Sequence, residues 1–303
     1  MPQKTPPRSQ TGKRSKVAGF ALKEWPLIGF TLLSQTAVGA FWMVTGASIY
    51  AEGANGWNSR YLTFPFLAAV VALMAAAAAI SLFHLGRPRR AVLALNNLKQ
   101  SWLSREILFA LAFMASTGFL ALLVFKKTYH PTLVRVLVGL GIAASILFLA
   151  SMSKLYMLRT VPAWRGLYTP LSFFGSALLM GPLGAASSYD GLLDLGRKVR
   201  PFQDAAAVIA LAVIVVILLT IFLFSPGVGL FGPKKATLLE LPTAKMYPLL
   251  IIRLLFLLAA VLCSYLYYQN QNPRLLPLGF LGAGAAEVCG RYLFYAVYSR
   301  LGV

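Results

Sequence analysis

The chain has 303 residues, of which 58% are hydrophobic and only 12% are charged. Because one soluble core cannot hide so much apolar surface, the composition excludes a soluble globular protein and indicates an integral membrane protein. The net charge of +20 invites a nucleic-acid-binding interpretation. The basic residues are spread over short segments between apolar runs, with no soluble module to read bases, so we expect contact with membrane lipid and none with nucleic acid.

Residues 1–24 form a basic tail rich in Pro, Gln, Ser and Thr, a composition typical of disordered segments. Its lysines and arginines suit the anionic headgroups of a membrane surface. Residues 25–303 are expected to form one transmembrane domain. The apolar first run is longer than the 7–15 residues of a cleavable signal core, so we expect it to be retained.

Apolar runs of helical length follow the tail in order. They cover residues 27–50, 62–83, 106–125, 133–153, 168–188, 205–224, 247–268 and 276–298. An α-helix needs about 20 residues to cross a hydrocarbon core of ~30 Å, whereas the strands of a membrane barrel would be about half as long. The sequence therefore predicts an all-α, polytopic bundle of about eight transmembrane helices, of which the fifth, with its internal Pro and Gly residues, is the least regular.

An even number of spans places both termini on one side of the membrane. Lys and Arg residues on that side, including those of the 84–105 loop, outnumber those on the other side. The rule that basic loops stay inside then predicts cytoplasmic termini. The same basic excess would also suit the docking of an acidic partner protein.

The 84–105 loop carries the most distinctive polar residues of the chain. His84 lies where the second run leaves the lipid, and Glu106 lies where the third run begins. Both side chains are expected at one face of the membrane and at similar depth. Since an imidazole and a carboxylate can each exchange a proton with a ligand that arrives from the lipid, we expect the pair to form an acid–base site.

Both residues also have ordinary interpretations. Ser104 could cap the third helix and place Glu106 in its first turn, where the macrodipole stabilises an acid by about 0.3–1 kcal/mol. His84 could be an interfacial hydrogen-bonding residue. An acid at a membrane boundary is unusual in a chain with eight acidic residues, which favours the functional interpretation.

The ligands for a redox cofactor are scarce. The two cysteines, Cys263 and Cys289, lie in separate runs without paired spacing, so we expect no iron–sulfur cluster in this chain. The two histidines, His84 and His130, are predicted at opposite faces, which argues against a bis-histidine haem. No other metal-binding spacing is present, so no metal site is predicted.

Three ordered segments carry a resemblance to a known family. They are His84-Leu-Gly-Arg-Pro-Arg-Arg with the downstream Glu106, Tyr156-Met-Leu-Arg-Thr-Val-Pro-Ala-Trp164, and Glu287-Val-Cys-Gly-Arg-Tyr-Leu-Phe-Tyr295. From about Trp25 to Val303 the chain resembles the membrane anchor subunit of the dimethyl sulfoxide reductase family. The resemblance implies a multi-pass subunit of a prokaryotic inner-membrane molybdopterin oxidoreductase complex that serves anaerobic respiration.

The resemblance also implies an activity and its partners. Such a subunit draws on the membrane quinone pool, oxidises quinol (menaquinol or ubiquinol) and passes the electrons to a partner iron–sulfur subunit, beside a catalytic molybdopterin subunit. His84 and Glu106 would be its catalytic residues. Quinol contacts would come from Arg87, Arg90, Tyr156 and Arg159. The ordinary alternative for the arginines is that they reach toward lipid headgroups.

Charged residues inside the runs raise a second class of function. Glu287 and Arg291 are spaced i, i+4 and would neutralise each other, while Arg253 needs a partner from another span, for which Glu287 is one candidate. We expect structural ties, although a proton-coupled transporter would also use such charges. A polysulfide-reductase-type subunit, a quinone-reducing subunit and a purely structural anchor are further alternatives.

Overall fold

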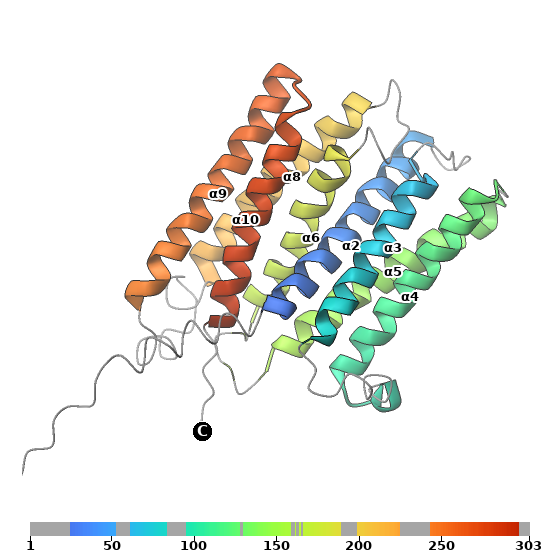
Figure 1. The fold of residues 1–303 in the computed structure, drawn as a ribbon, viewed down its shortest axis with the longest axis horizontal. Helices are drawn as coiled ribbons and strands as arrows, with labels where there is room; N and C mark the ends of the chain where they lie inside the picture. Colours follow the sequence, from blue (N-terminus) through green and yellow to red (C-terminus); the bar gives the residue numbers. More distant parts are fainter. Residues whose placement is uncertain are drawn as a thin grey trace, which may run out of the picture.

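The computed structural model describes residues 25–52, 61–83, 95–127, 130–158, 161, 164, 166–188, 199–224 and 243–296. Within these ranges, eight α-helices run side by side and alternate in direction (Figure 1). They are α2 (Trp25–Glu52), α3 (Phe64–Leu82), α4 (Trp102–Phe125), α5 (Pro131–Tyr156), α6 (Tyr168–Ser187), α8 (Val199–Phe224), α9 (Thr243–Asn270) and α10 (Leu275–Ala296). The all-α polytopic bundle is confirmed, while the predicted N-terminal tail lies outside the described residues.

Six of the eight described helices, all except α6 and α10, are long and apolar enough to cross a membrane. Helix α6 corresponds to the fifth apolar run, which was predicted to be the least regular, and it contains Pro182. Most of its side chains are buried by neighbouring helices. A proline inside a transmembrane helix is tolerated where neighbouring helices shield the backbone. The chain is thus a multi-pass membrane protein with α6 in its interior.

Local sequence signals fix several helix starts. The Thr63 hydroxyl accepts a hydrogen bond from the Phe66 amide (3.4 Å) at the start of α3, and the Ser101 hydroxyl accepts one from the Ser104 amide (3.3 Å) at the start of α4. These contacts satisfy amides that the first turn of a helix leaves without a partner. Pro131 opens α5, where its missing N–H costs nothing.

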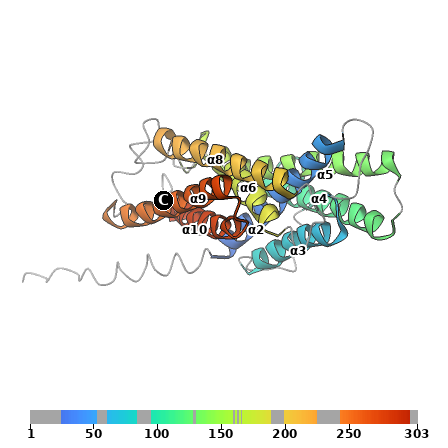
Figure 2. The same ribbon diagram turned by 90° about the horizontal axis from the view of Figure 1, so that it is seen from above.

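Helices α2 and α6 form the centre of the bundle (Figures 1 and 2). Helix α2 packs against α3 and α6, and α6 also packs against α8, while α4 pairs with α5 and α9 pairs with α10. Gly39 and Gly181 bring the two central backbones together. A Cβ atom on Gly39 would lie 1.8 Å from the Ala177 carbonyl oxygen, and one on Gly181 would lie 2.1 Å from the Gly39 carbonyl carbon. Only glycine permits this approach, which is typical of close transmembrane helix pairs.

The alternation of direction gives the bundle two distinct ends. Helices α2, α4, α6 and α9 begin, and α3, α5, α8 and α10 end, at the same end of the bundle (Figure 1). We call this end the N-terminal face, and the other end the opposite face. Glu106, near the start of α4, and Tyr156, the last residue of α5, therefore lie toward the N-terminal face.

Candidate functional site

Glu106 is a buried acid close to the N-terminal face. Glu106 is only 3% exposed, and its Oε2 atom has no hydrogen-bond partner among the described residues. Helix α4 begins at Trp102 with Ser101 as its cap, and its first turn contains no acidic residue. The alternative in which Ser104 caps the helix and Glu106 serves its first turn is therefore wrong. A buried carboxylate oxygen without a donor is costly unless something else contacts it.

The segment before α4 is held against the helix by Arg105. The guanidinium donates to the carbonyl oxygens of Leu98 (2.8 Å) and Lys99 (2.7 Å) and lies over the Trp102 ring, 4.3 Å from its centre. These contacts fix residues 98–105 as one unit. Arg105 thereby turns outward while the neighbouring Glu106 points into the bundle, because adjacent helical positions lie about 100° apart.

Two tyrosines lie within electrostatic reach of Glu106. The Tyr295 hydroxyl of α10 donates to the Tyr156 hydroxyl of α5 over 3.1 Å, and Tyr295 also contacts the Thr31 side chain of α2. The Glu106 carboxyl group interacts electrostatically with both phenols. The structure thus brings Glu106 near Tyr156, two residues predicted for the site, and adds Tyr295, which was not among the predicted site residues.

An aromatic cluster encloses Tyr156. The rings of Trp164, Phe173 and Phe294 stand nearly perpendicular to it, with centres 5.6, 5.5 and 5.7 Å away. Trp164 is buried, and its indole N–H donates to the Phe294 carbonyl oxygen over 2.8 Å. Edge-to-face packing of this kind stabilises aromatic pairs beyond simple burial. The position of the Tyr156 hydroxyl is therefore set by rings from several segments of the chain.

A charged network continues from this cluster into the bundle. Arg291 is 1% exposed, stacks over the Phe173 ring at 4.0 Å, and donates to Gln35 Oε1 (2.9 Å) and Ser176 Oγ (2.8 Å). The Ser176 hydroxyl in turn donates to Glu287. Arg291 also acts electrostatically on Tyr295. The guanidinium therefore joins three helices and connects the tyrosine pair to Glu287.

The ion pairing inside the bundle differs partly from the prediction. Arg253 Nη2 lies 3.3 Å from Glu287 Oε1, so the predicted candidate partner of Arg253 is its actual partner. The direct i, i+4 pair of Glu287 with Arg291 is not formed, because Ser176 lies between them. The described network thus contains two guanidinium groups and one carboxylate. Arg291, one of these two guanidinium groups, acts electrostatically on both tyrosines of the pair.

Four of the six predicted site residues cannot be placed. His84, Arg87, Arg90 and Arg159 lie outside the described residues. The described chain ends next to two of them, with α3 ending at Leu82 and its cap at Phe83, and with the segment after α5 described to Leu158. Within the described ranges, no three His, Cys, Asp or Glu side chains gather into a potential metal site.

Comparisons with known proteins identify relatives along nearly the whole sequence. The family model of the DMSO reductase anchor subunit (DmsC) matches residues 18–297. The anaerobic dimethyl sulfoxide reductase chain YnfH of Escherichia coli (strain K12) is 29% identical over 94% of this chain and 98% of its own length. The C subunit of the anaerobic dimethyl sulfoxide reductase of Haemophilus influenzae is 28% identical over 93% of this chain and 97% of its own length. The C subunit of the Escherichia coli (strain K12) enzyme is 27% identical over 94% of this chain and 98% of its own length.

Proposed function

Since this chain belongs to the DMSO reductase anchor subunit (DmsC) family, we propose that it binds and oxidises quinol near its N-terminal face and passes the electrons to the other subunits of a reductase complex. The buried Glu106 carboxylate supports this proposal most directly. Its unpartnered oxygen belongs to a carboxyl group that interacts electrostatically with the hydrogen-bonded phenols of Tyr156 and Tyr295, near the start of α4.

The chemistry of quinol oxidation suits these groups. Conversion of quinol to quinone releases two electrons and two protons. Glu106 accepts one hydroxyl proton and His84, just beyond the end of α3, accepts the other. Tyr156 orients a quinol oxygen, and Arg87, Arg90 and Arg159 supply further contacts at the same face. Both protons then leave to the aqueous phase at the N-terminal face.

The electrons need a partner at the same face. The relatives that resemble this protein are named as subunits of anaerobic dimethyl sulfoxide reductases. We propose that an iron–sulfur subunit docks on the N-terminal face and receives the electrons, and that a molybdopterin subunit lies beyond it. The distribution of basic residues supports a cytoplasmic location for this face.

The decisive test replaces Glu106. Glu106→Gln keeps the volume and a hydrogen-bonding group but removes the proton acceptor, so quinol-dependent turnover of the assembled complex should fall about 100-fold or more. Reduction of the complex by an artificial soluble dye should be unchanged, because the dye feeds the partner centres directly. Asp204→Asn, the same change at the opposite face, is the matched control and should turn over quinol at the parent rate.

His84→Asn is expected to behave as Glu106→Gln does, since the amide keeps a polar group at the interface without a titrating ring. If both variants assemble and still oxidise quinol at near-parent rates, the site assignment is wrong. If the variants instead lose the partner subunits from the membrane, the two residues act in docking, and a purely structural anchor becomes the better description.

A further inference from the structure

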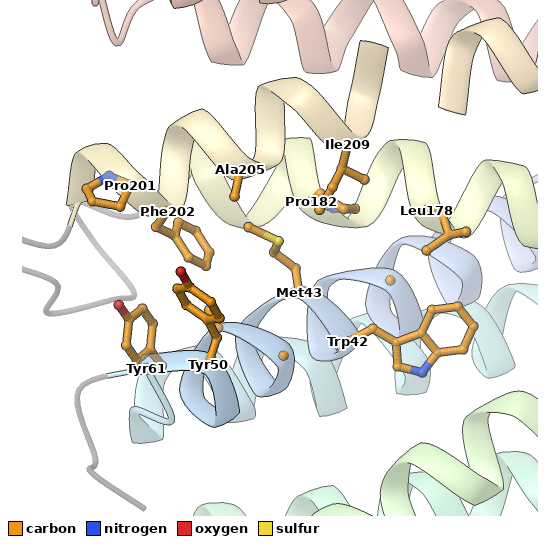
Figure 3. Close-up of a pocket in the computed structure, with 13 residues that line it drawn as sticks. Trp42, Met43, Tyr50, Tyr61, Leu178, Pro182, Pro201, Phe202, Ala205 and Ile209 are labelled. Carbon is orange, nitrogen blue, oxygen red and sulfur yellow. The ribbon is translucent and has the colours of Figure 1, made fainter. Parts of the chain in front are cut away.

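A cavity lies in the half of the bundle that faces away from Glu106. Its volume is about 340 Å³, and helices α2, α6 and α8 form its walls (Figure 3). Trp42 and Leu178 lie at its inner end, while Tyr50, Tyr61 and Phe202 lie together at the other end. Cavities of this size accommodate ligands in many proteins. The polar network of the N-terminal face contributes no residue to it.

The cavity has the depth of one membrane leaflet. Along α2 it extends from Gly39 to Tyr50, a length of ~16 Å at the α-helical rise of about 1.5 Å per residue. Half of a ~30 Å hydrocarbon core is about the same distance. A ligand that fills the cavity is therefore extended along the membrane normal, from the interface of the opposite face to the bilayer centre.

Aromatic rings lie at the mouth of the cavity, and an exposed cation is next to a lining residue in the sequence. Tyr50 is 92% exposed, and the Tyr61 ring lies 6.1 Å from the Phe202 ring. Arg200 is exposed and directly precedes Pro201, which lines the cavity. The nearby Asp204 carboxylate accepts a hydrogen bond from Gln271 over 3.2 Å and so faces the segment between α9 and α10. Tyrosines and a basic residue at this depth are typical of contact with phospholipid headgroups.

We propose that this cavity binds one acyl chain of a phospholipid in the leaflet of the opposite face, with an anionic headgroup beside Arg200. The length of the cavity matches an acyl chain from headgroup to bilayer centre, and its walls supply apolar contacts throughout. Among the described residues that line it there is no carboxylate and no imidazole, so a quinol would find no proton acceptor. The lipid site and the quinol site thus lie at opposite faces and are chemically distinct.

Gly46 offers a direct test of occupancy. This residue lines the cavity, and an added Cβ would meet no atom within 4 Å, so Gly46→Leu adds volume at the cavity wall from an unobstructed position. Gly139 on α5 is equally unobstructed but does not line the cavity, which makes Gly139→Leu the matched control. The full-length protein is purified from nanodiscs that contain phosphatidylglycerol and phosphatidylcholine, and the retained lipids are counted by native mass spectrometry. We expect Gly46→Leu to lower phosphatidylglycerol occupancy about tenfold, while Gly139→Leu retains it.

Arg200 tests the headgroup independently of the cavity volume. Arg200→Gln should reduce the preference for phosphatidylglycerol over phosphatidylcholine about fivefold and leave the protein folded, because the residue is exposed. Three outcomes would each overturn the proposal. They are retention of the same amount of lipid by Gly46→Leu and Gly139→Leu, release of all lipid by the parent protein, and recovery of a quinone in place of the phospholipid. Should Gly46→Leu fail to fold, an unchanged headgroup preference in Arg200→Gln would overturn it, and a lost preference would support it.

Discussion

The two halves of the bundle hold their helices together by different means. Toward the N-terminal face, a polar network of Arg253, Glu287 and Arg291 joins α2, α6, α9 and α10. Toward the opposite face, α2 and α6 separate around an apolar cavity beyond the contact of Gly39 with Gly181. A charged group inside a membrane is costly and is kept where it has a partner or a function. Among the described residues, the contrast is thus between a buried ion pair in one half and an apolar cavity in the other.

The largest predicted effect comes from breaking the ion pair. Arg253→Met leaves the Glu287 carboxylate buried with Ser176 as its remaining partner, and should lower the free energy of unfolding by about 3–5 kcal/mol. The double variant Arg253→Met/Glu287→Met removes both charges and should recover most of that loss. Unfolding of the purified protein in mixed micelles with increasing SDS measures both. A double variant as unstable as the single one would show that the pair is not the source of stability.

The glycine contact gives the next largest effect. Gly181→Ala forces a methyl group against the Gly39 backbone and should cost about 3 kcal/mol, because neither backbone can move aside without separating the central helices. Gly139→Ala on α5 points into open space outside the cavity and is the control. Thermal unfolding in detergent compares the two variants. Similar midpoints would mean that the central helices tolerate a wider spacing.

Tyrosine substitutions compare the two halves directly. Tyr295→Phe removes the hydrogen bond to Tyr156, and Tyr267→Phe removes the one to Gln203 (3.3 Å) in the other half. Each should cost about 1 kcal/mol of stability. Quinol turnover, measured on the assembled complex, should fall only for Tyr295→Phe, since this tyrosine interacts electrostatically with Glu106 and binds Tyr156. Equal turnover by the two variants would mean that the Tyr156–Tyr295 pair is not part of the quinol site.

The smallest effect is expected where the two halves meet. The Trp42 indole N–H, at the inner end of the cavity, donates to the Ser145 hydroxyl of α5 over 2.8 Å. Ser145→Ala should cost about 0.6 kcal/mol, the average for hydrogen bonds between transmembrane helices. The same unfolding assay resolves this value when it is compared with Ser153→Ala, whose hydroxyl donates to the Leu149 carbonyl oxygen of its own helix. A loss of stability larger than that of the tyrosine variants would contradict the ranking of the contacts.

The sequence predicts the helices well because the apolar runs are long and the charges within them are rare. Arg253 and Glu287 stand out for the same reason, and their pairing follows from the need to neutralise a guanidinium in lipid. The start of α4 was misplaced because Ser101 and Ser104 are both good caps. The sequence does not show which of two serines three positions apart caps the helix. The structure shows that Ser101 is the cap and that Glu106, beyond the first turn, packs into the bundle.

The partners of Arg291 could not be predicted. Gln35, Ser172 and Ser176 are uncharged, and residues of their kinds recur along several spans. Which of them faces α10 depends on how α2 and α6 are rotated, and the Gly39 contact with Gly181 sets that rotation. Tyr295 was missed for a similar reason. It lies among several aromatic residues near the end of α10, and only the fold shows which one meets Tyr156.

The pairing of Arg253 with Glu287 also bears on how the protein is made. Helix α9 leaves the ribosome before α10, and only residues 271–274 separate the two. An arginine near the centre of a helix opposes insertion by about 2.5–3.5 kcal/mol as long as it lacks a counter-ion. Insertion of α9 and α10 together, as a helical hairpin, delivers the guanidinium already neutralised by Glu287. The same hairpin carries Arg291, so Ser176 of α6 and Gln35 of α2 supply the polar contacts that hold its charged groups against the central helices.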